Sequence, residues 1–161
     1  MTLRSTWIGS AIRGVGSTLR GQVVGLDTAP LIYYIETNPS YIHLLDPFFD
    51  ALDLGELDVV TSMVTLLEVL VQPIRRGDVA LADRYRDVLL NTPNLTSLPV
   101  TEDVAEEAAR LRAAHNLRTP DSIQMATALL SGASHFLTND AKLASIPGMQ
   151  VSTLDALRFA P

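Results

Sequence analysis

Residues 57–74 read LDVVTSMVTLLEVLVQPI, and this stretch decides the expected fold. The first part, LDVVTS (57–62), is a short apolar run that predicts a strand. The second part, MVTLLEVLVQPI (63–74), predicts a largely buried helix. A strand that passes directly into a helix is the unit from which parallel α/β sheets are built.

The same alternation continues on both sides of this stretch. Upstream, QVVGLD (22–27) predicts a buried strand ending at Asp27, and helices are expected over 31–37 and 40–54. Downstream, a helix is expected over 78–90, then strands at 95–100, 135–138 and 149–153. Two more helices are expected, one capped by Thr101 with Val104, Ala108 and Leu111 on its apolar face, and one starting at Pro120 with Ile123, Ala126, Thr127 and Leu130 at helical spacing. This order predicts a parallel sheet covered on both faces, a three-layer α/β/α sandwich.

Composition limits what the chain can be. Its 161 residues, 47% of them hydrophobic, fit one domain. The chain has no cysteine, which excludes disulfides, thiolate nucleophiles and cysteine-bound zinc, and a cytoplasmic location is expected. No apolar run approaches the roughly 20 residues that span a bilayer, so no membrane contact is expected.

Charge is distributed unevenly along the chain. The net charge is −6. This is unusual for a protein that binds nucleic acid, because contacts to phosphates are normally supplied by Lys and Arg. Residues 1–20 carry Arg4, Arg13 and Arg20 and no acid, so the remainder is more acidic than the whole. We expect residues 1–22 to form an N-terminal extension and residues 23–161 to form the domain. An acidic domain can still bind a polyanion if divalent metal neutralises its carboxylates.

Four acidic residues are expected near the carboxyl edge of the sheet, where parallel α/β proteins bind ligands. Asp27 follows the first strand, and Asp140 follows the strand at 135–138. Asp121 opens a helix, and Glu68 lies two turns into the helix after the second strand. Asp27 and Asp140 are also ordinary turn or cap residues, and Asp121 also suits the first turn of a helix. Glu68 is different, because a lone charge in an apolar helix is costly unless it is paired or bound to metal.

Together the four acids suggest metal chemistry. Mg²⁺ and Mn²⁺ prefer oxygen ligands, so a few converging carboxylates suffice to bind them. Two such ions roughly 4 Å apart can activate a water and stabilise the leaving oxygen of a phosphodiester.

The segments LDTAPLIYYIE, TSMVTLLEVL, LRTPDSIQMATAL and FLTND, in this order, resemble the successive motifs of PIN-domain proteins, particularly the VapC-like toxins of toxin–antitoxin pairs. The resemblance implies a five-stranded parallel sheet and a Mg²⁺- or Mn²⁺-dependent endoribonuclease that cleaves RNA. It also implies a homodimer and a cognate antitoxin. Carried over by position, Asp27, Glu68, Asp121 and Asp140 would be the catalytic metal ligands, and Thr28, Thr65, Thr138 and Asn139 their polar supports. Ser122 and Gln124 depart from the family pattern, which often has Ala and His there.

Other functions fit the sequence less well. A haloacid-dehalogenase-like phosphatase needs a second acid two residues after Asp27, where this chain has Ala29. A receiver domain needs an early acidic pair, which is missing. A catalytically silent PIN scaffold that binds RNA or a protein partner remains the alternative.

Overall fold

The computed structural model describes residues 19–158, which form a five-stranded parallel sheet with helices on both faces. The strands are β1 (Val23–Leu26), β2 (Asp58–Ser62), β3 (Leu95–Leu98), β4 (His135–Thr138) and β5 (Gln150–Thr153). The helices are α2 (Thr28–Ile35), α3 (Ile42–Asp53), α4 (Met63–Arg76), α5 (Val79–Asn91), α6 (Glu102–His115), α7 (Thr119–Leu130) and α8 (Leu154–Arg158). The predicted strands and fold class are confirmed.

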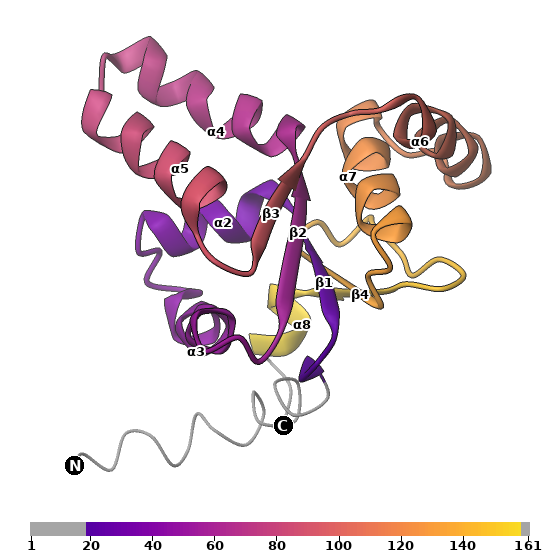
Figure 1. Cartoon of the computed structure of the whole chain (residues 1–161), viewed down its shortest axis with the longest axis horizontal. Helices are drawn as coiled ribbons and strands as arrows, with labels where there is room; N and C mark the ends of the chain where they lie inside the picture. The colour runs from indigo at the N-terminus through magenta and orange to yellow at the C-terminus, as the bar shows by residue number, and fades with distance from the viewer. Residues whose placement is uncertain (1–18, 159–161) are drawn as a thin grey trace.

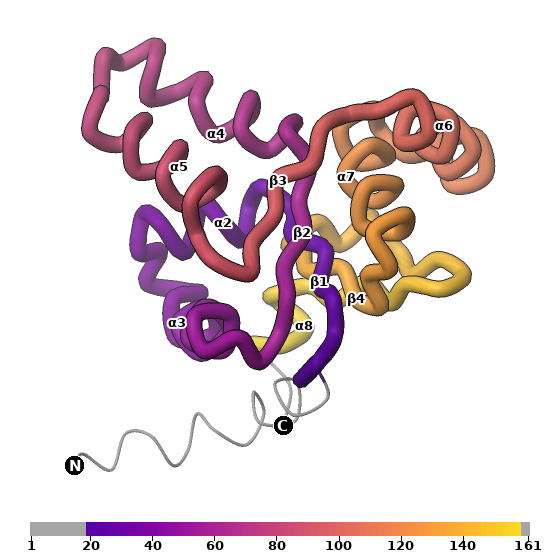
Figure 2. The backbone as a smooth tube through the Cα atoms, viewed as in Figure 1, coloured from indigo at the N-terminus to yellow at the C-terminus, as the bar shows by residue number. Residues whose placement is uncertain are grey.

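The strand order is β3-β2-β1-β4-β5. Helices α6 and α7 cover one face of the sheet, and α2, α3, α4 and α5 lie on the other (Figure 1). The backbone tube shows β1 and β2 side by side in the middle of the molecule (Figure 2). The predicted three-layer sandwich is therefore confirmed.

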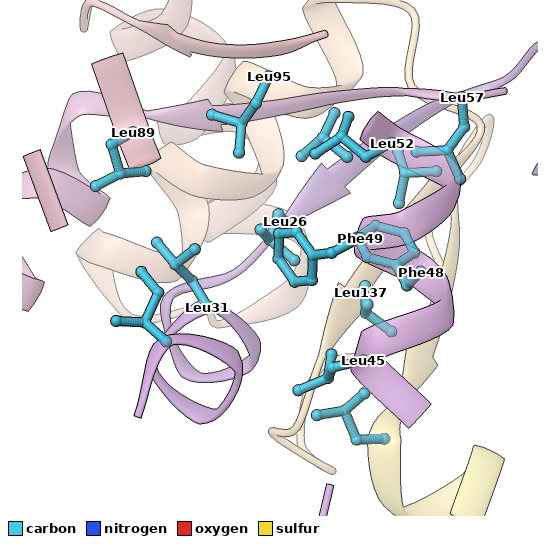
Figure 3. Packing of buried hydrophobic residues seen from close by; sticks show 14 of the residues in the cluster. Leu26, Leu31, Leu45, Phe48, Phe49, Leu52, Leu57, Leu89, Leu95 and Leu137 are labelled. Carbon is cyan, nitrogen blue, oxygen red and sulfur yellow. The ribbon is translucent and has the colours of Figure 1, made fainter. Parts of the chain in front are cut away.

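Two apolar clusters fill the spaces between the layers, because successive strand residues point to opposite faces. Val59 and Leu137 belong to the cluster under α2, α3 and α5, whereas their neighbours Val60 and Phe136 belong to the cluster under α6 and α7. Figure 3 shows the first cluster, in which leucines from strands and helices gather around Phe49. Each buried Leu or Phe contributes about 1.5–3 kcal/mol relative to exposure.

The expected extension falls mostly outside the described residues, since the structure describes nothing before residue 19. Leu19 is only 5% exposed and packs in the first cluster. Arg20 pairs with Glu56 at 2.9 Å, and the amide of Gly21 donates to the Glu56 carbonyl at 2.8 Å. Residues 19–21, at the end of the expected extension, therefore pack against the domain.

Position 25 lies where α7 meets β1. A Cβ atom at Gly25 would stand 2.5 Å from Cβ of Ala128 and 2.7 Å from Cδ2 of Phe136, well inside van der Waals contact. Glycine thus allows α7 to rest directly on β1. This contact brings the helix that carries Asp121 close to the strand that precedes Asp27.

The expectation that residues 63–74 form a largely buried helix is wrong. In α4, Leu67, Val71 and Ile74 are 65%, 41% and 62% exposed. Only Thr65, Val69 and Pro73 are buried. Helix α4 pairs with α5 and projects from the edge of the sheet (Figure 1), so no further layer covers its outer face.

The apolar face expected for the helix after Pro120 is also partly wrong. Leu130 is 50% exposed and Ile123 is partly buried, whereas Gln124, Met125 and Ala128 are at most 2% exposed. Helix α7 lies between the sheet and α6, so it is covered on two sides, and polar residues at its start face the strand ends.

Two smaller features complete the fold. Thr101 caps α6 as predicted, because its hydroxyl accepts from the amide of Val104 at 3.3 Å. The short helix α8 was not predicted. Within residues 19–158, no helix combines the length and the apolar character needed to cross a bilayer.

Candidate metal-binding and catalytic site

The strand order reverses next to β1, since the chain proceeds from β1 to β2 and β3 on one side and later adds β4 and β5 on the other. Open parallel sheets bind ligands at the carboxyl ends of their strands near such a reversal. Asp27 follows β1, and Asp140 lies two residues after β4. The structure therefore places both acids at the switch point.

Asp27 is held on both of its carboxylate oxygens. As the N-cap of α2, its Oδ1 accepts from the amide of Thr28 at 2.8 Å. Its Oδ2 accepts from the hydroxyl of Thr138 at 2.7 Å. Burial raises the pKa of Asp27, and the charges of Asp121 and Asp140 raise it further, against the lowering effect of these hydrogen bonds. Asp27 is thus a rigidly held carboxylate in an environment that disfavours its charge.

Glu68 approaches the same place from α4. Glu68 is exposed, so the expectation of a lone charge inside a buried helix is wrong. Its Oε1 accepts from the hydroxyl of Thr28 at 3.1 Å. Partial burial raises the pKa of Glu68, and the charges of Asp27 and Asp121 add to this effect. Glu68 therefore belongs electrostatically to the same group of acids.

A buried polar network lies beneath these two acids. Gln124, 2% exposed, donates from Nε2 to the hydroxyls of Thr28 and Thr65, at 3.1 and 2.6 Å. Thr61 and Thr65 share a hydrogen bond of 2.7 Å, and Thr61 is also within 2.9 Å of the Leu26 carbonyl. Because Gln124 donates to Thr28, the Thr28 hydroxyl proton is free to point at Glu68.

The orientation of the Gln124 amide follows from its surroundings. Its Oε1 accepts from the Thr61 hydroxyl at 3.3 Å and from the amide of Ser62 at 3.4 Å. No buried side-chain nitrogen or oxygen among residues 19–158 lacks a hydrogen-bond partner. Sequence reasoning treated Gln124 only as a departure from a family pattern and did not single out Thr61. A polar residue three positions after Asp121, within an apolar helix, was the available signal.

Asp121 and Asp140 are joined by an arginine that the sequence reasoning missed. Nε of Arg118 donates to Oδ2 of Asp121 at 2.8 Å, and the same guanidinium lies 3.4 Å from its Oδ1. Nη2 of Arg118 is also 3.6 Å from Oδ2 of Asp140. The Asp121 side chain is 10% exposed, whereas that of Arg118 is 75% exposed. Hydrogen bonding to Asp121 raises the pKa of Arg118, helped by the charges of Asp121, Asp140 and Asp27.

The predicted polar supports divide into two groups. The hydroxyl of Thr138 donates to Asp27 and accepts from the amide of Asp140 at 3.0 Å, so it ties two of the acids together. Thr28 contacts Asp27 and Glu68, and Thr65 reaches Glu68 only through Gln124 and Thr28. Asn139, in contrast, donates to the hydroxyl of Tyr41 at 3.1 Å and accepts from the amide of Asp155 at 3.2 Å.

The donor set is chemically suited to a hard divalent cation, since it consists of carboxylate and hydroxyl oxygens. The charges of Asp121 and Asp140 raise the pKa of Asp27, and those of Asp27 and Asp121 raise the pKa of Glu68. In the arrangement described for residues 19–158, however, no three Asp, Glu or His side chains are grouped as ligands of one ion. Two of the acids, Asp121 and Asp140, instead share the guanidinium of Arg118 as their counter-charge.

Fold and acid cluster together define a parallel α/β domain with a carboxylate-lined switch point. The sequence model described as "PIN domain" matches residues 24–149. No curated protein matches the chain. The chain belongs to the PIN domain family.

Solved structures that share this fold include three toxin–antitoxin complexes. A toxin–antitoxin complex from Klebsiella pneumoniae contains a chain that is 24% identical, with a TM-score of 0.60, covering 79% of this chain and 94% of the other. VapBC2 from Rickettsia felis, bound to a promoter DNA fragment, is 16% identical with a TM-score of 0.65, covering 81% and 98%. DNA-bound VapBC from Salmonella typhimurium is 19% identical with a TM-score of 0.57, covering 83% and 98%. At these identities the likeness is one of fold.

Proposed function

We propose that this protein is a Mg²⁺- or Mn²⁺-dependent endoribonuclease that acts as the toxin of a toxin–antitoxin pair. The observation that carries the proposal is the linkage of the acids at the switch point. Thr138 joins Asp27 to Asp140, Arg118 joins Asp140 to Asp121, and Thr28 joins Asp27 to Glu68. The family match and the three neighbouring toxin–antitoxin structures support it.

In the proposed site, Asp27, Glu68, Asp121 and Asp140 hold the divalent cations. Bound cations of this kind polarise a phosphodiester and lower the pKa of an attacking water. The protein's own residues set the geometry. Thr138 and the α2 amide fix the direction of the Asp27 oxygens, and Thr28, held by Gln124, directs Glu68.

Activity is tested with the purified full chain and a pool of RNA oligonucleotides, in the presence of Mn²⁺, Mg²⁺ or EDTA. We expect cleavage only with added metal, and we expect Asp27→Asn to abolish it. Asp78→Asn is a matched control, because Asp78 also caps a helix, accepting from the amide of Leu81 at 3.0 Å, but lies on the surface at α5. Cleavage that persists in excess EDTA would contradict the proposal, and no cleavage of any RNA would favour the silent scaffold.

The toxin role has a separate test. Induced expression in a bacterial host is expected to arrest growth, and Asp27→Asn is expected to relieve the arrest. Co-expression of a short reading frame adjacent to the gene should also relieve it if an antitoxin is the partner. Growth that is unaffected by an active nuclease would limit the proposal to RNA cleavage. Light scattering tests the homodimer, which the resemblance implies.

A further inference from the structure

The contacts of Arg118 with the acids of the site differ from those of an ordinary surface ion pair. Arg118 is the N-cap residue of α7 and makes no side-chain capping bond. Its guanidinium instead reaches Asp121 in its own helix and Asp140 after β4. One exposed side chain therefore connects two of the proposed metal ligands from separate segments.

Arg110 provides a comparison. It makes the same kind of contacts, at 3.0 Å, with Glu106 and Glu107 of its own helix. Those pairs lie along the surface of α6, where ion pairs contribute little. Asp121 is only 10% exposed, and a buried carboxylate without a counter-charge is costly. Arg118 therefore offsets a charge that the protein must otherwise neutralise in another way.

A divalent cation would neutralise the same charge. Arg118 takes both oxygens of Asp121 and approaches one oxygen of Asp140. A divalent cation on these oxygens would lie within a few ångströms of the guanidinium, and the repulsion between the two positive charges sets them in competition for the same carboxylates. The Arg118 side chain is 75% exposed, so a cation that took over its carboxylate partners could displace the guanidinium into solvent.

We propose that Arg118 is a built-in competitor of the metal: it holds Asp121 and Asp140 together in the metal-free protein and is displaced when a divalent cation binds. This inference rests on the proposed metal dependence. The Arg118 contacts carry the inference, because they join the acid of α7 to the acid that follows β4.

Binding of Mn²⁺ to the RNA-free full chain tests the proposal, measured by calorimetry and by the signal of free Mn²⁺ in electron paramagnetic resonance. Arg118→Gln is expected to lower the Kd for Mn²⁺ about tenfold, the change that loss of one favourable charged contact would give. Arg118→Lys keeps a charge but lacks the planar fork, so an intermediate Kd is expected. Arg110→Gln should bind Mn²⁺ like the wild type.

Thermal melting separates competition from a merely structural role. In EDTA, Arg118→Gln should melt below the wild type, because Asp121 loses its partner. At saturating Mn²⁺ the difference should vanish, so the gain in Tm from metal is larger in the variant. A loss of Tm that is the same with and without Mn²⁺ would overturn the proposal.

The possible failures are distinguishable. If the wild type binds Mn²⁺ and Arg118→Gln binds it equally or more weakly, the competition is refuted while metal dependence stands. If Arg118→Gln does not fold, the Kd of Arg118→Lys decides by the same criterion. If neither the wild type nor the variants bind Mn²⁺ or Mg²⁺, both this inference and the proposed function fail.

Discussion

The two halves of the acid cluster are held in different ways. Asp27 and Glu68, here called the threonine-held pair, accept hydrogen bonds from Thr28 and Thr138. Asp121 and Asp140, the arginine-bridged pair, share the guanidinium of Arg118. Neutral amide and hydroxyl donors fix the first pair, and an exposed cation joins the second.

The difference separates two tasks within one site. Neutral hydrogen bonds persist whatever charge arrives, so the threonine-held pair provides a fixed reference. The buried Gln124 beneath it adds rigidity, since every polar group of that network has a partner. Under the proposed competition, an incoming cation would displace the guanidinium, so the arginine-bridged pair would respond to metal. Preorganisation and response to metal are thereby assigned to separate residues.

The largest expected effect comes from removing one acid of each pair. Asp27→Asn and Asp121→Asn should each lower RNA cleavage more than about 100-fold, because loss of a group that only orients a ligand already costs about 10–100-fold. The double variant should be little worse than either single one if the pairs form one site. Initial cleavage rates under metal saturation measure this. Multiplying losses would show two independent sites.

Gln124 tests the rigidity of the threonine-held pair. Gln124→Leu leaves the Thr65 hydroxyl and the Ser62 amide short of a partner and should cost about 1–3 kcal/mol in the free energy of unfolding. Cleavage should fall about 10–100-fold, since Thr28 no longer directs Glu68. Urea unfolding and cleavage rates measure the two effects.

The matched control for that substitution is Thr127→Val. Thr127 is also buried on α7, at 1% exposure, but its hydroxyl bonds only to the Ile123 carbonyl of the same helix. We expect cleavage to be unchanged in this variant. Full activity of Gln124→Leu, or an equal loss in Thr127→Val, would mean that the network does not position Glu68.

Asn139 sharpens the boundary of the site. Its side chain joins Tyr41 to the start of α8, so Asn139→Ala should cost about 1 kcal/mol of stability, or about 2–4 °C in Tm for a chain of this size. The response to Mn²⁺ should remain that of the wild type. A weakened Mn²⁺ response would return Asn139 to the metal site.

The smallest expected effect is a pH dependence of stability in EDTA that arises from Asp27 of the threonine-held pair. Burial and neighbouring acids raise the pKa of Asp27 above its ordinary value of 3.8. The folded protein then retains a proton that the unfolded chain releases, so stability is lost as pH rises from the ordinary value through the raised one. Asp27→Asn lacks this penalty and still caps α2.

We therefore expect Asp27→Asn to unfold at higher urea than the metal-free wild type at pH 7, and the difference to shrink as the pH falls towards the ordinary value of 3.8. A difference that grows towards low pH would contradict the assigned direction. Asp78→Asn again serves as the control, because Asp78 lies exposed at the surface.

Sequence reasoning predicted the order of the strands and of every helix except α8, because hydrophobic period is a local property. That the four acids bind metal stays a prediction. The coverage of α4 was not local: Leu67, Val71 and Ile74 look buried until it is clear that no layer lies beyond them. Arg118 and Asn139 illustrate the same limit. Arg118 lies three residues before Asp121 and Asn139 directly before Asp140, but whether a side chain turns toward the acid depends on the fold.

Thr138 and Asn139 make this concrete. Neighbouring residues at a strand end point to opposite sides, and accordingly Thr138 contacts Asp27 while Asn139 contacts Tyr41. Both were predicted to support the acids because the family resemblance implies it for these positions. The two side chains point to opposite sides because the backbone alternates, and the position of α3 places Tyr41 next to Asn139.

Gly25 sets how closely β1 and α7 approach each other, and through them the distance between Asp27 and Asp121. Asp27 stands two residues along the strand from the point where β1 touches α7, and Asp121 stands two turns along the helix from the same point, at Ala128. One extra methyl group there would push the strand and the helix apart, and the misfit would be transmitted to the distance between the two carboxylates. Gly25→Ala adds no charge and contacts no acid, yet it would alter the geometry of the site. The distance between the two carboxylates therefore depends in part on a core position where only a hydrogen atom fits.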